Sequence, residues 1–255
     1  MLHSLISKLI SSTRSLLAPN ADSCLVCYGP RASSSGELSL CRVCFEHIPW
    51  IRPDDIRCDV CGRFESCPDC RRRKDTWFEL NLSVVKYNDT MKDWLGRFKY
   101  RGDERLQLLF AGMFESLFHR FLAHQAWRAK DITVVTYVPL SKQRLEERGF
   151  NQAELFARAL GSSFRIPVAP LLDRARHTGK QSYKTREERI SDLRGVFAPN
   201  EEGISWLSTT VHNKPSQLVV VVDDVYTTGS TMNECARIIR ECAPNSRVFS
   251  LTWAR

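Results

Sequence analysis

The segment Leu218–Thr231 constrains the fold of this chain more than any other stretch. It opens with a leucine and four valines, which suit a strand that is buried on both faces of a parallel sheet. Asp223 and Asp224 follow directly, then a hydroxyl-rich turn with a single glycine, and then a helical pattern from Met232. Open α/β sheets bind ligands at the carboxyl ends of their strands, which is where the two carboxylates fall. The segment therefore predicts a strand, a ligand-binding turn and a helix within an α/β domain.

The chain around this segment alternates between strand and helix patterns from residue 82 onward. Strands that alternate with helices imply parallel crossover connections, so the predicted fold class is α/β with a doubly wound sheet. The charged stretch Arg174–Arg194 is interpreted as an excursion over the site, and Glu201–Lys214 as a surface connection. The patterns predict strands at Leu82–Tyr87, Ile132–Val138, Leu218–Val222 and Arg247–Trp253, and helices at Met91–Phe98, Arg105–Phe121, Gln152–Leu160 and Met232–Cys242.

The turn after the two aspartates is suited to bind a phosphate group. Backbone N–H groups of Thr227–Thr231 can converge on a phosphate at a helix N-terminus, and the hydroxyls add donors. Thr231 and Glu234 have capping-box spacing, which predicts the helix start. Adjacent carboxylates would repel a phosphate, so Asp223 and Asp224 are better explained as partners of ribose hydroxyls, with or without Mg²⁺. The alternative is an ordinary α/β core with an accidental acid pair, and the ordered combination of features argues against it.

Eight of the ten cysteines form four Cys-x-x-Cys pairs, and two such pairs supply the four thiolates of a tetrahedral zinc site. Disulfides would fit a secreted chain, and no secretion signal is visible, so the spacing favours zinc. His47 is the only nearby histidine, which indicates two structural ions rather than a catalytic one. Sequential pairing places the first four cysteines on one ion and the last four on the other, with cross-bracing as the alternative. The cysteines are Cys24, Cys27, Cys41, Cys44, Cys58, Cys61, Cys67 and Cys70.

The first twenty residues carry leucines and isoleucines at helical spacing. This pattern predicts a short amphipathic helix over residues 1–20 that docks on the protein body or on a partner rather than on a membrane. Ser4, Ser7 and Lys8 interrupt the apolar stretch that a secretory signal would need. The chain also lacks the run of about 18 apolar residues of a transmembrane helix, so we expect a cytoplasmic protein. Its formal net charge of +8 favours anionic partners.

Together these motifs resemble the ComF/GntX family, in which a double zinc ribbon precedes a type-I phosphoribosyltransferase domain. Val219–Thr231 is similar to the phosphoribosyl-diphosphate (PRPP) signature of type-I phosphoribosyltransferases, and departs from it at Tyr226, where most members carry an aliphatic residue. Three further stretches match the family, namely Phe98–Tyr100, Val138–Gln152 with its Arg-Gly-Phe-Asn-Gln run, and Gln181–Phe197. We therefore expect a double zinc ribbon over residues 21–75 and a phosphoribosyltransferase-like domain over residues 80–255.

The resemblance implies displacement of pyrophosphate from C1 of PRPP by an acceptor that the sequence does not identify. Mg²⁺ would accompany PRPP. Arg144 and Arg148 follow the predicted strand end at Pro139, so a loop could present them to the pyrophosphate. Asp192 stands where many relatives carry Asn, which places a negative charge near the diphosphate. The implied catalytic residues are Asp223, Asp224, Arg144 and Arg148; the implied phosphate turn is Val225, Tyr226, Thr227, Thr228, Gly229, Ser230 and Thr231; and the implied pyrophosphate and flexible-loop residues are Lys142, Gln181, Lys184, Arg186 and Arg189.

A second interpretation concerns nucleic acid. ComF relatives are linked to DNA uptake and natural transformation, so the resemblance suggests contact with single-stranded DNA and with DNA-uptake proteins. A run of four basic residues is followed by Trp77 and Phe78, so positive charge lies beside aromatic rings on which bases could stack. The alternative is that the run is a solvated linker and that the two aromatic residues belong to the core. The sequence therefore leaves two functions open. The first is a phosphoribosyltransferase that acts in DNA uptake or in nucleotide-linked metabolism. The second is a non-catalytic factor that senses PRPP and binds single-stranded DNA. The basic run is Arg71, Arg72, Arg73 and Lys74.

Overall fold

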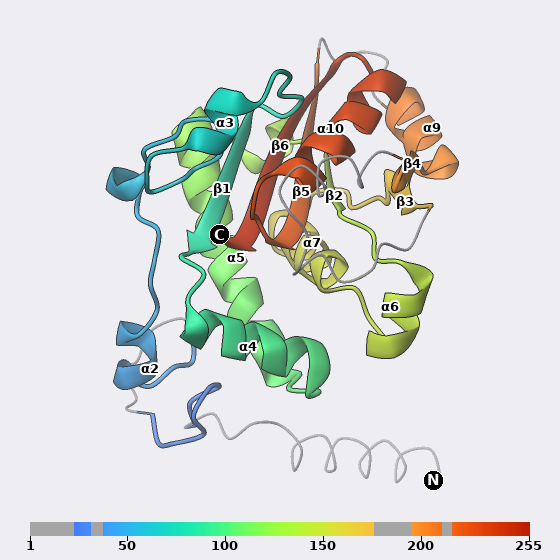
Figure 1. The fold of residues 1–255 in the computed structure, drawn as a ribbon. Helices are drawn as coiled ribbons and strands as arrows, with labels where there is room; N and C mark the ends of the chain where they lie inside the picture. Colours follow the sequence, from blue (N-terminus) through green and yellow to red (C-terminus); the bar gives the residue numbers. More distant parts are fainter. Residues whose placement is uncertain (1–22, 32–37, 176–194, 211–215) are drawn as a thin grey trace, which may run out of the picture.

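The centre of the fold is a four-stranded parallel sheet. The computed structural model describes residues 23–31, 38–175, 195–210 and 216–255, and within them the strand order is β1-β6-β5-β2 (Figure 1). The two middle strands, β5 and β6, are buried along most of their length. This sheet confirms the parallel α/β fold that the alternating patterns predict. Its strands are β1 (Leu80–Val85), β2 (Val134–Tyr137), β5 (Gln217–Val225) and β6 (Ser246–Ala254).

Helices cover both faces of the sheet. One face packs against α4 (Asp89–Tyr100), α5 (Arg105–Gln125) and α7 (Gln152–Phe164). The other face packs against α10 (Ser230–Cys242) and α9 (Glu201–Thr210), together with a small hairpin. The hairpin pairs β3 (Leu172–Arg174) with β4 (Phe197–Pro199), and the short helix α6 (Lys142–Arg148) follows β2. Among the described residues, the remaining helices are α2 (Arg42–Glu46), η1 (Pro53–Asp55), α3 (Pro68–Arg72) and η2 (Ala129–Asp131).

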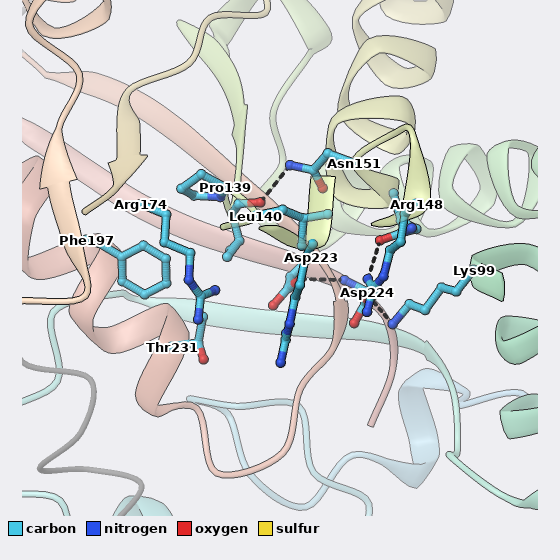
Figure 2. Close-up of a pocket in the computed structure, with 13 residues that line it drawn as sticks. Lys99, Pro139, Leu140, Arg148, Asn151, Arg174, Phe197, Asp223, Asp224 and Thr231 are labelled. Atoms are coloured by element: carbon cyan, nitrogen blue, oxygen red, sulfur yellow. Dashed lines mark hydrogen bonds and ion pairs between the residues drawn. The ribbon is translucent and has the colours of Figure 1, made fainter. Parts of the chain in front are cut away.

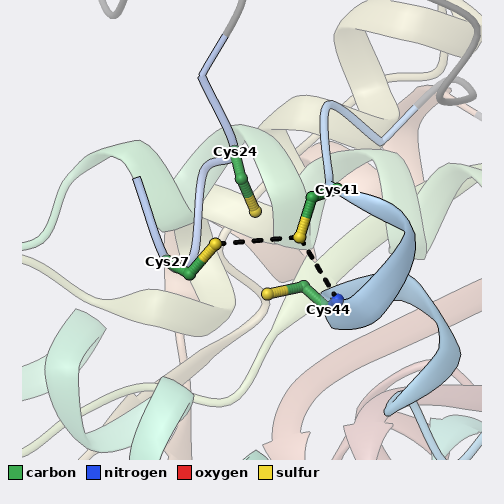
Figure 3. Close-up of side chains that lie close together, drawn as sticks. All are labelled: Cys24, Cys27, Cys41 and Cys44. Carbon is green, nitrogen blue, oxygen red and sulfur yellow. Dashed lines mark hydrogen bonds between the residues drawn. The ribbon is translucent and has the colours of Figure 1, made fainter. Parts of the chain in front are cut away.

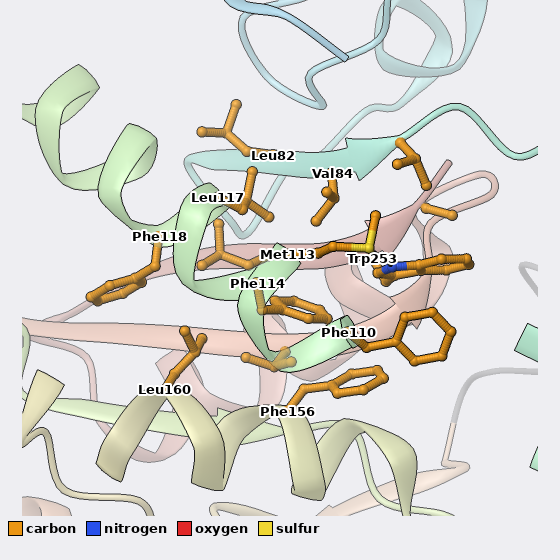
Figure 4. Close-up of a cluster of buried hydrophobic side chains, with 14 of the residues drawn as sticks. Leu82, Val84, Phe110, Met113, Phe114, Leu117, Phe118, Phe156, Leu160 and Trp253 are labelled. Atoms are coloured by element: carbon orange, nitrogen blue, oxygen red, sulfur yellow. Dashed lines mark hydrogen bonds between the residues drawn. The ribbon is translucent and has the colours of Figure 1, made fainter. Parts of the chain in front are cut away.

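Aromatic side chains of α5 form a core with Phe156 and Trp253 (Figure 4). Apolar residues recur every three or four positions along this helix, so one broad face is buried against β1, β6 and α7. The rings of Phe110 and Trp253 lie 4.5 Å apart, and those of Phe114 and Phe156 lie 4.7 Å apart. Each such side chain contributes about 1.5–3 kcal/mol by leaving water. The core therefore fixes α4 and α7, which both reach the site described below.

The four strands and four helices predicted from the sequence are all present, and two other predictions are wrong. Residues 201–210 form the helix α9 rather than a surface connection, because Leu207 is fully buried in the second core. The predicted capping box is absent, since α10 begins at Ser230 with Gly229 as its N-cap. Glu234 pairs instead with Arg237 at 2.8 Å, one turn further along the helix.

Two further expectations concern regions for which little is described. The amphipathic helix expected over residues 1–20 lies outside the described residues, as do residues 176–194 of the expected excursion. Arg174, at the start of that excursion, is the last residue of β3. In the parts of the chain that the structure describes, no helix has both the length and the apolar character needed to cross a bilayer.

Candidate functional site

The eight paired cysteines form two groups, and Figure 3 shows the first of them. Within each group the four sulfur atoms all lie within 4.8 Å of one another. Four thiolates at about 2.3 Å from a tetrahedral zinc ion are about 3.8 Å apart. The sulfur atoms of Cys27 and Cys41 lie 3.7 Å apart and those of Cys61 and Cys67 lie 3.5 Å apart, in agreement with this geometry. The grouping is sequential, so the cross-braced alternative is wrong. The groups are cluster 1 (Cys24, Cys27, Cys41 and Cys44) and cluster 2 (Cys58, Cys61, Cys67 and Cys70).

Backbone N–H groups point at the sulfur atoms of both clusters. Cys41 and Cys67 are the N-caps of α2 and α3, and each accepts a hydrogen bond from the backbone three residues later, at 3.4 and 3.5 Å. Burial alone raises the pKa of Cys24 and Cys67, but hydrogen bonds from the backbone and from the neighbouring cysteines outweigh it and bring each pKa to about 7. Donors of this kind stabilise thiolates, the form that binds metal. The two clusters can therefore bind two zinc ions.

We expect two tightly held zinc ions per chain. Cys235 and Cys242 belong to neither cluster, so the zinc sites account for eight of the ten thiols. Metal analysis of protein purified in reducing buffer should return close to two equivalents. Thiol titration after denaturation with a chelator should then return all ten cysteines. One equivalent would mean that one cluster does not bind, and oxidised thiols without metal would contradict both sites.

A cavity of about 190 Å³ lies at the carboxyl ends of β2 and β5 (Figure 2). The acid pair lines it from the end of β5, and Thr231 lines it from the first turn of α10. Four cationic side chains also line the cavity and outnumber the two carboxylates, so its charge favours an anionic ligand. The cations are Lys99 from α4, Arg144 and Arg148 from α6, and Arg174 from β3.

The two carboxylates at the end of β5 have different environments. Asp224 forms an ion pair with Lys99, whereas Asp223 accepts a hydrogen bond from the backbone N–H of Asp224 at 2.8 Å. Burial, and then the neighbouring Asp224 charge, raise the pKa of Asp223 to about 8. Asp223 is therefore largely protonated at neutral pH. Asp223 is the group that can change its protonation when a ligand arrives.

Arg144 and Arg148 lie on the helix α6, so the prediction that a loop presents them is wrong. Ser141 caps this helix by accepting from the backbone N–H of Arg144 at 3.4 Å, and Gly149 ends it with a φ of +76°. Arg148 donates to Gln152 at 3.0 Å and to the Tyr100 hydroxyl at 2.7 Å. Among the described residues, Arg148 Nε and Gln152 Nε2 are buried and have no hydrogen-bond partner. Both residues line the cavity, although these two nitrogen atoms are themselves enclosed and have almost no exposed surface.

The other residues of the Arg-Gly-Phe-Asn-Gln run hold a corner of the cavity together. Asn151 donates to the Val138 carbonyl at 3.0 Å and accepts from the Ala153 backbone N–H at 3.1 Å, which caps α7. Phe150 packs on Phe98 of α4, with the two ring centres 5.2 Å apart. The run thus places Arg148 and Gln152 at the cavity and fixes α6, α7 and α4 around them.

Within the predicted phosphate turn, Thr231 is the residue that lines the cavity. Tyr226 is buried in the second core against Phe78, and its backbone N–H donates to the Ala254 carbonyl at 2.8 Å. Gly229 has a φ of +78°, and a Cβ atom there would lie 2.0 Å from the Tyr226 hydroxyl, so the turn requires glycine. Lys142 is exposed and does not line the cavity, and four predicted loop residues lie outside the described residues, namely Gln181, Lys184, Arg186 and Arg189.

Comparison with known proteins places the chain in a family. No family model matches it. It is 33% identical to the competence protein ComFC of Bacillus subtilis over 207 residues, which cover 78% of this chain and 77% of that protein. The chain belongs to the ComF family. It is also 30% identical to ComFC of Streptococcus pneumoniae over 92% of this chain and 90% of that protein. The DNA utilization protein YhgH of Escherichia coli K12 is a more distant relative, at 25% identity over 85% of this chain and 89% of that protein.

Three basic residues at the site of this ComF family member were not assigned to it from the sequence. Lys99 lies in the Phe-Lys-Tyr match to the ComF family, which was the available signal. Arg174 was assigned to the excursion, yet it lines the cavity, and burial followed by repulsion from Arg144 lowers its pKa. Arg73 was assigned to a nucleic-acid track, yet it donates to the Thr228 carbonyl of the phosphate turn at 2.5 Å. The other three residues of the basic run are exposed, namely Arg71, Arg72 and Lys74.

Proposed function

We propose that the cavity binds PRPP or a related ribose 5-phosphate compound, and that the chain acts in DNA uptake. The strongest support is the lining of the cavity, where a carboxylate pair and four cationic side chains surround one space. A ribose phosphate carries acceptor oxygens at its phosphates and donor hydroxyls on its sugar, so it complements both sides of the cavity. Guanidinium groups bind phosphate oxygens through strong, charge-assisted hydrogen bonds.

Each side of the cavity has its own role in this proposal. Asp223 and Asp224 accept hydrogen bonds from the ribose hydroxyls, and Lys99 holds Asp224 in place through their ion pair. The first turn of α10, entered at Gly229 and lined by Thr231, takes the 5-phosphate, because a helix N-terminus carries unpaired N–H groups and partial positive charge. The diphosphate then lies toward the cations that line the remaining wall, namely Arg144, Arg148 and Arg174.

These residues also suit transfer chemistry at C1 of the ribose. As the C1–oxygen bond breaks, positive charge develops on the sugar and negative charge develops on the departing diphosphate. The cavity arginines are fixed cations that stabilise the leaving diphosphate without needing to reorganise. Mg²⁺ bound to the diphosphate would add further charge neutralisation, and the Asp223 and Asp224 carboxylates have the oxygen ligands that it prefers. Asp223 and Asp224 would hold such an ion through their carboxylate oxygens, with Asp223 in its deprotonated form.

Isothermal titration with PRPP, ribose 5-phosphate and pyrophosphate tests the binding proposal. We expect PRPP to bind more tightly than either fragment, since it engages both ends of the cavity. Pyrophosphate release in the presence of a panel of bases and nucleic acids then separates two functions. Release that depends on an acceptor indicates a transferase, and PRPP binding without release indicates a sensor. Failure to bind PRPP at millimolar concentration would remove the proposal.

A second candidate function is direct binding of single-stranded DNA. The relatives are named competence and DNA utilization proteins, and three basic side chains beside cluster 2 are exposed to solvent. Trp77 follows them and is half-buried, with the Arg240 guanidinium 5.6 Å from its ring centre. The track proposed for a DNA backbone therefore consists of Arg71, Arg72 and Lys74, and it excludes Arg73.

Replacing Arg71, Arg72 and Lys74 together with alanine should weaken single-stranded DNA binding and flatten its salt dependence. Each lost phosphate contact changes the slope of log K against log salt by about 0.7 on single strands, so three contacts change it by about two. The measurement is fluorescence anisotropy of a labelled oligonucleotide over a series of salt concentrations. PRPP affinity should stay unchanged, because none of the three side chains lines the cavity. An unaltered slope would place the DNA surface elsewhere on the protein.

A further inference from the structure

The segment between cluster 2 and β1 lies along the phosphate turn. Arg73 comes directly after α3, three residues beyond the cluster ligand Cys70. Its Nη2 atom donates to the Thr228 carbonyl at 2.5 Å, across 155 residues of sequence. The rest of the segment is bound to α10, since the Trp77 backbone N–H donates to the Asn233 side chain at 2.9 Å. Asn233 in turn donates to the Asp75 carbonyl at 3.1 Å. The segment is therefore fixed at one end by the cluster and along its length by α10.

The Arg73 guanidinium is enclosed by the residues that shape the turn. It lies 5.4 Å from the ring centre of Phe78, which packs edge-on against Tyr226. A Cβ atom on Gly229 would lie 2.7 Å from Arg73 Nη2, so the guanidinium touches the glycine that gives the turn its left-handed backbone. Tyr226 is held from another side by Arg255, which lies 4.7 Å from its ring centre and donates to the Cys61 carbonyl. Cluster 2 and the turn thus share one packed set of side chains.

The Arg73 hydrogen bond sets the direction of a peptide group in the turn. A trans peptide is planar, so its carbonyl and its N–H point in opposite directions. With the Thr228 carbonyl held toward Arg73, the N–H of Gly229 is directed to the other side of the turn. Rotation of this peptide would place a carbonyl dipole where an anion needs a donor. The bond from Arg73 therefore favours one of two peptide orientations, the one with its donor available for a phosphate.

We propose that Arg73 is a positioning residue that holds the phosphate turn in its binding conformation, and that cluster 2 places it there through α3. This inference rests on the proposed ribose-phosphate site and assigns that site a residue from the zinc-binding part of the chain. Arg73 acts through the backbone of the turn and does not line the cavity. Its neighbour Arg72 has the same charge and is exposed, so it serves as a matched control.

The test compares the variants Arg73→Ala, Arg73→Lys and Arg72→Ala with the unmodified protein. Loss of a hydrogen bond from a charged donor should weaken PRPP binding about tenfold in Arg73→Ala. Arg73→Lys should recover part of the affinity, because an ammonium can donate to the Thr228 carbonyl but cannot stack on Phe78 in the same way. Arg72→Ala should bind PRPP normally. Zinc content should remain at two equivalents in all three variants.

Hydrogen exchange of the peptide that spans residues 226–231 provides a readout that needs no ligand. We expect faster exchange in Arg73→Ala, partial recovery in Arg73→Lys and no change in Arg72→Ala. Unchanged PRPP affinity and unchanged exchange in Arg73→Ala would overturn the inference and leave the ribose-phosphate site standing. Equal losses in Arg72→Ala would also overturn it, since they would indicate a general charge effect. If the unmodified protein does not bind PRPP, the proposed function fails, and the exchange data alone decide whether Arg73 shapes the turn.

Discussion

Replacing both aspartates at the end of β5 with asparagine, as D223N with D224N, should weaken PRPP binding about a hundredfold. A hydrogen bond to a charged group is worth about 1.5–3 kcal/mol, or one to two decades of affinity. The double variant loses such a bond at Asp224 and a weaker one at Asp223, whose pKa of about 8 keeps it largely protonated at neutral pH. Lys99 would also lose its ion-pair partner and with it the contact that holds its ammonium at the cavity. Isothermal titration of PRPP against both proteins measures the effect. Superimposable titration curves would remove the PRPP assignment from this cavity.

Thermal unfolding of D223N between pH 5 and 9 controls for misfolding. The native Asp223 carboxyl has a pKa of about 8, above the value of about 3.9 for an unfolded chain. Between these values the native state binds a proton that the unfolded state lacks, so this group's contribution to stability is full below about pH 4 and is lost as pH rises through about 8. A single group changes the free energy of unfolding by at most about 1.4 kcal/mol per pH unit. D223N should lose this slope and be more stable than the unmodified protein at pH 9. Equal slopes would show that Asp223 titrates normally.

Substitution of Cys61 with serine should lower the stability of the fold as well as remove a zinc ion. Cys61 is 1% exposed and its carbonyl accepts hydrogen bonds from Asn81 and Arg255, so cluster 2 is continuous with the second core. Structural zinc contributes about 10–16 kcal/mol of binding free energy in small zinc domains, as much as the whole stability of a typical domain. We expect one zinc equivalent to be lost and the melting temperature to fall by more than about 10 °C.

Cys242→Ser is the matched control for this experiment. Cys242 is exposed at the end of α10 and belongs to neither cluster, so its substitution should leave zinc content and melting temperature unchanged. Differential scanning fluorimetry and metal analysis of the two variants, prepared in parallel, make the comparison. A Cys61→Ser protein that keeps two zinc ions and the original melting temperature would show that cluster 2 is not a structural metal site.

The features predicted correctly from the sequence are local ones. The strand of β5, the long apolar face of α5 and the Cys-x-x-Cys groups depend on residue spacing within one segment, which the sequence displays directly. The helix α6 was missed because its seven residues, between Ser141 and Gly149, are too few to show a period. The helix α9 was missed because its polar residues resemble a connection, although Leu207 is fully buried.

Two of the site's basic contacts could not be predicted from residue spacing because their partners lie in distant segments. Lys99 reaches Asp224 only through the packing of α4 beside the sheet, and Arg73 reaches Thr228 only through the path from cluster 2. No spacing rule connects such pairs. Tyr226 is a second example of a feature that residue spacing does not explain. Most relatives carry an aliphatic residue at this position, and the side chains that contact Tyr226 explain the difference. Tyr226 packs edge-on against Phe78 and beneath Arg255, in a space that the sequence alone does not reveal.

Because β6 lies between β1 and β5, the sheet cannot be completed during synthesis until β6 has been made. Ser83 and Thr252 share a hydrogen bond in the sheet at 2.7 Å, yet they are 169 residues apart in the chain. A ribosome that has made β1 must therefore finish β6 before β1 gains its strand neighbour, and contacts of such long range form slowly. Until then the part of the α5 face that packs on β6, such as Phe110 against Trp253, stays uncovered and prone to aggregation. β5 pairs with β2 on one side and with β6 on the other, so the strand that carries the acid pair gains its second neighbour only when β6 has been made.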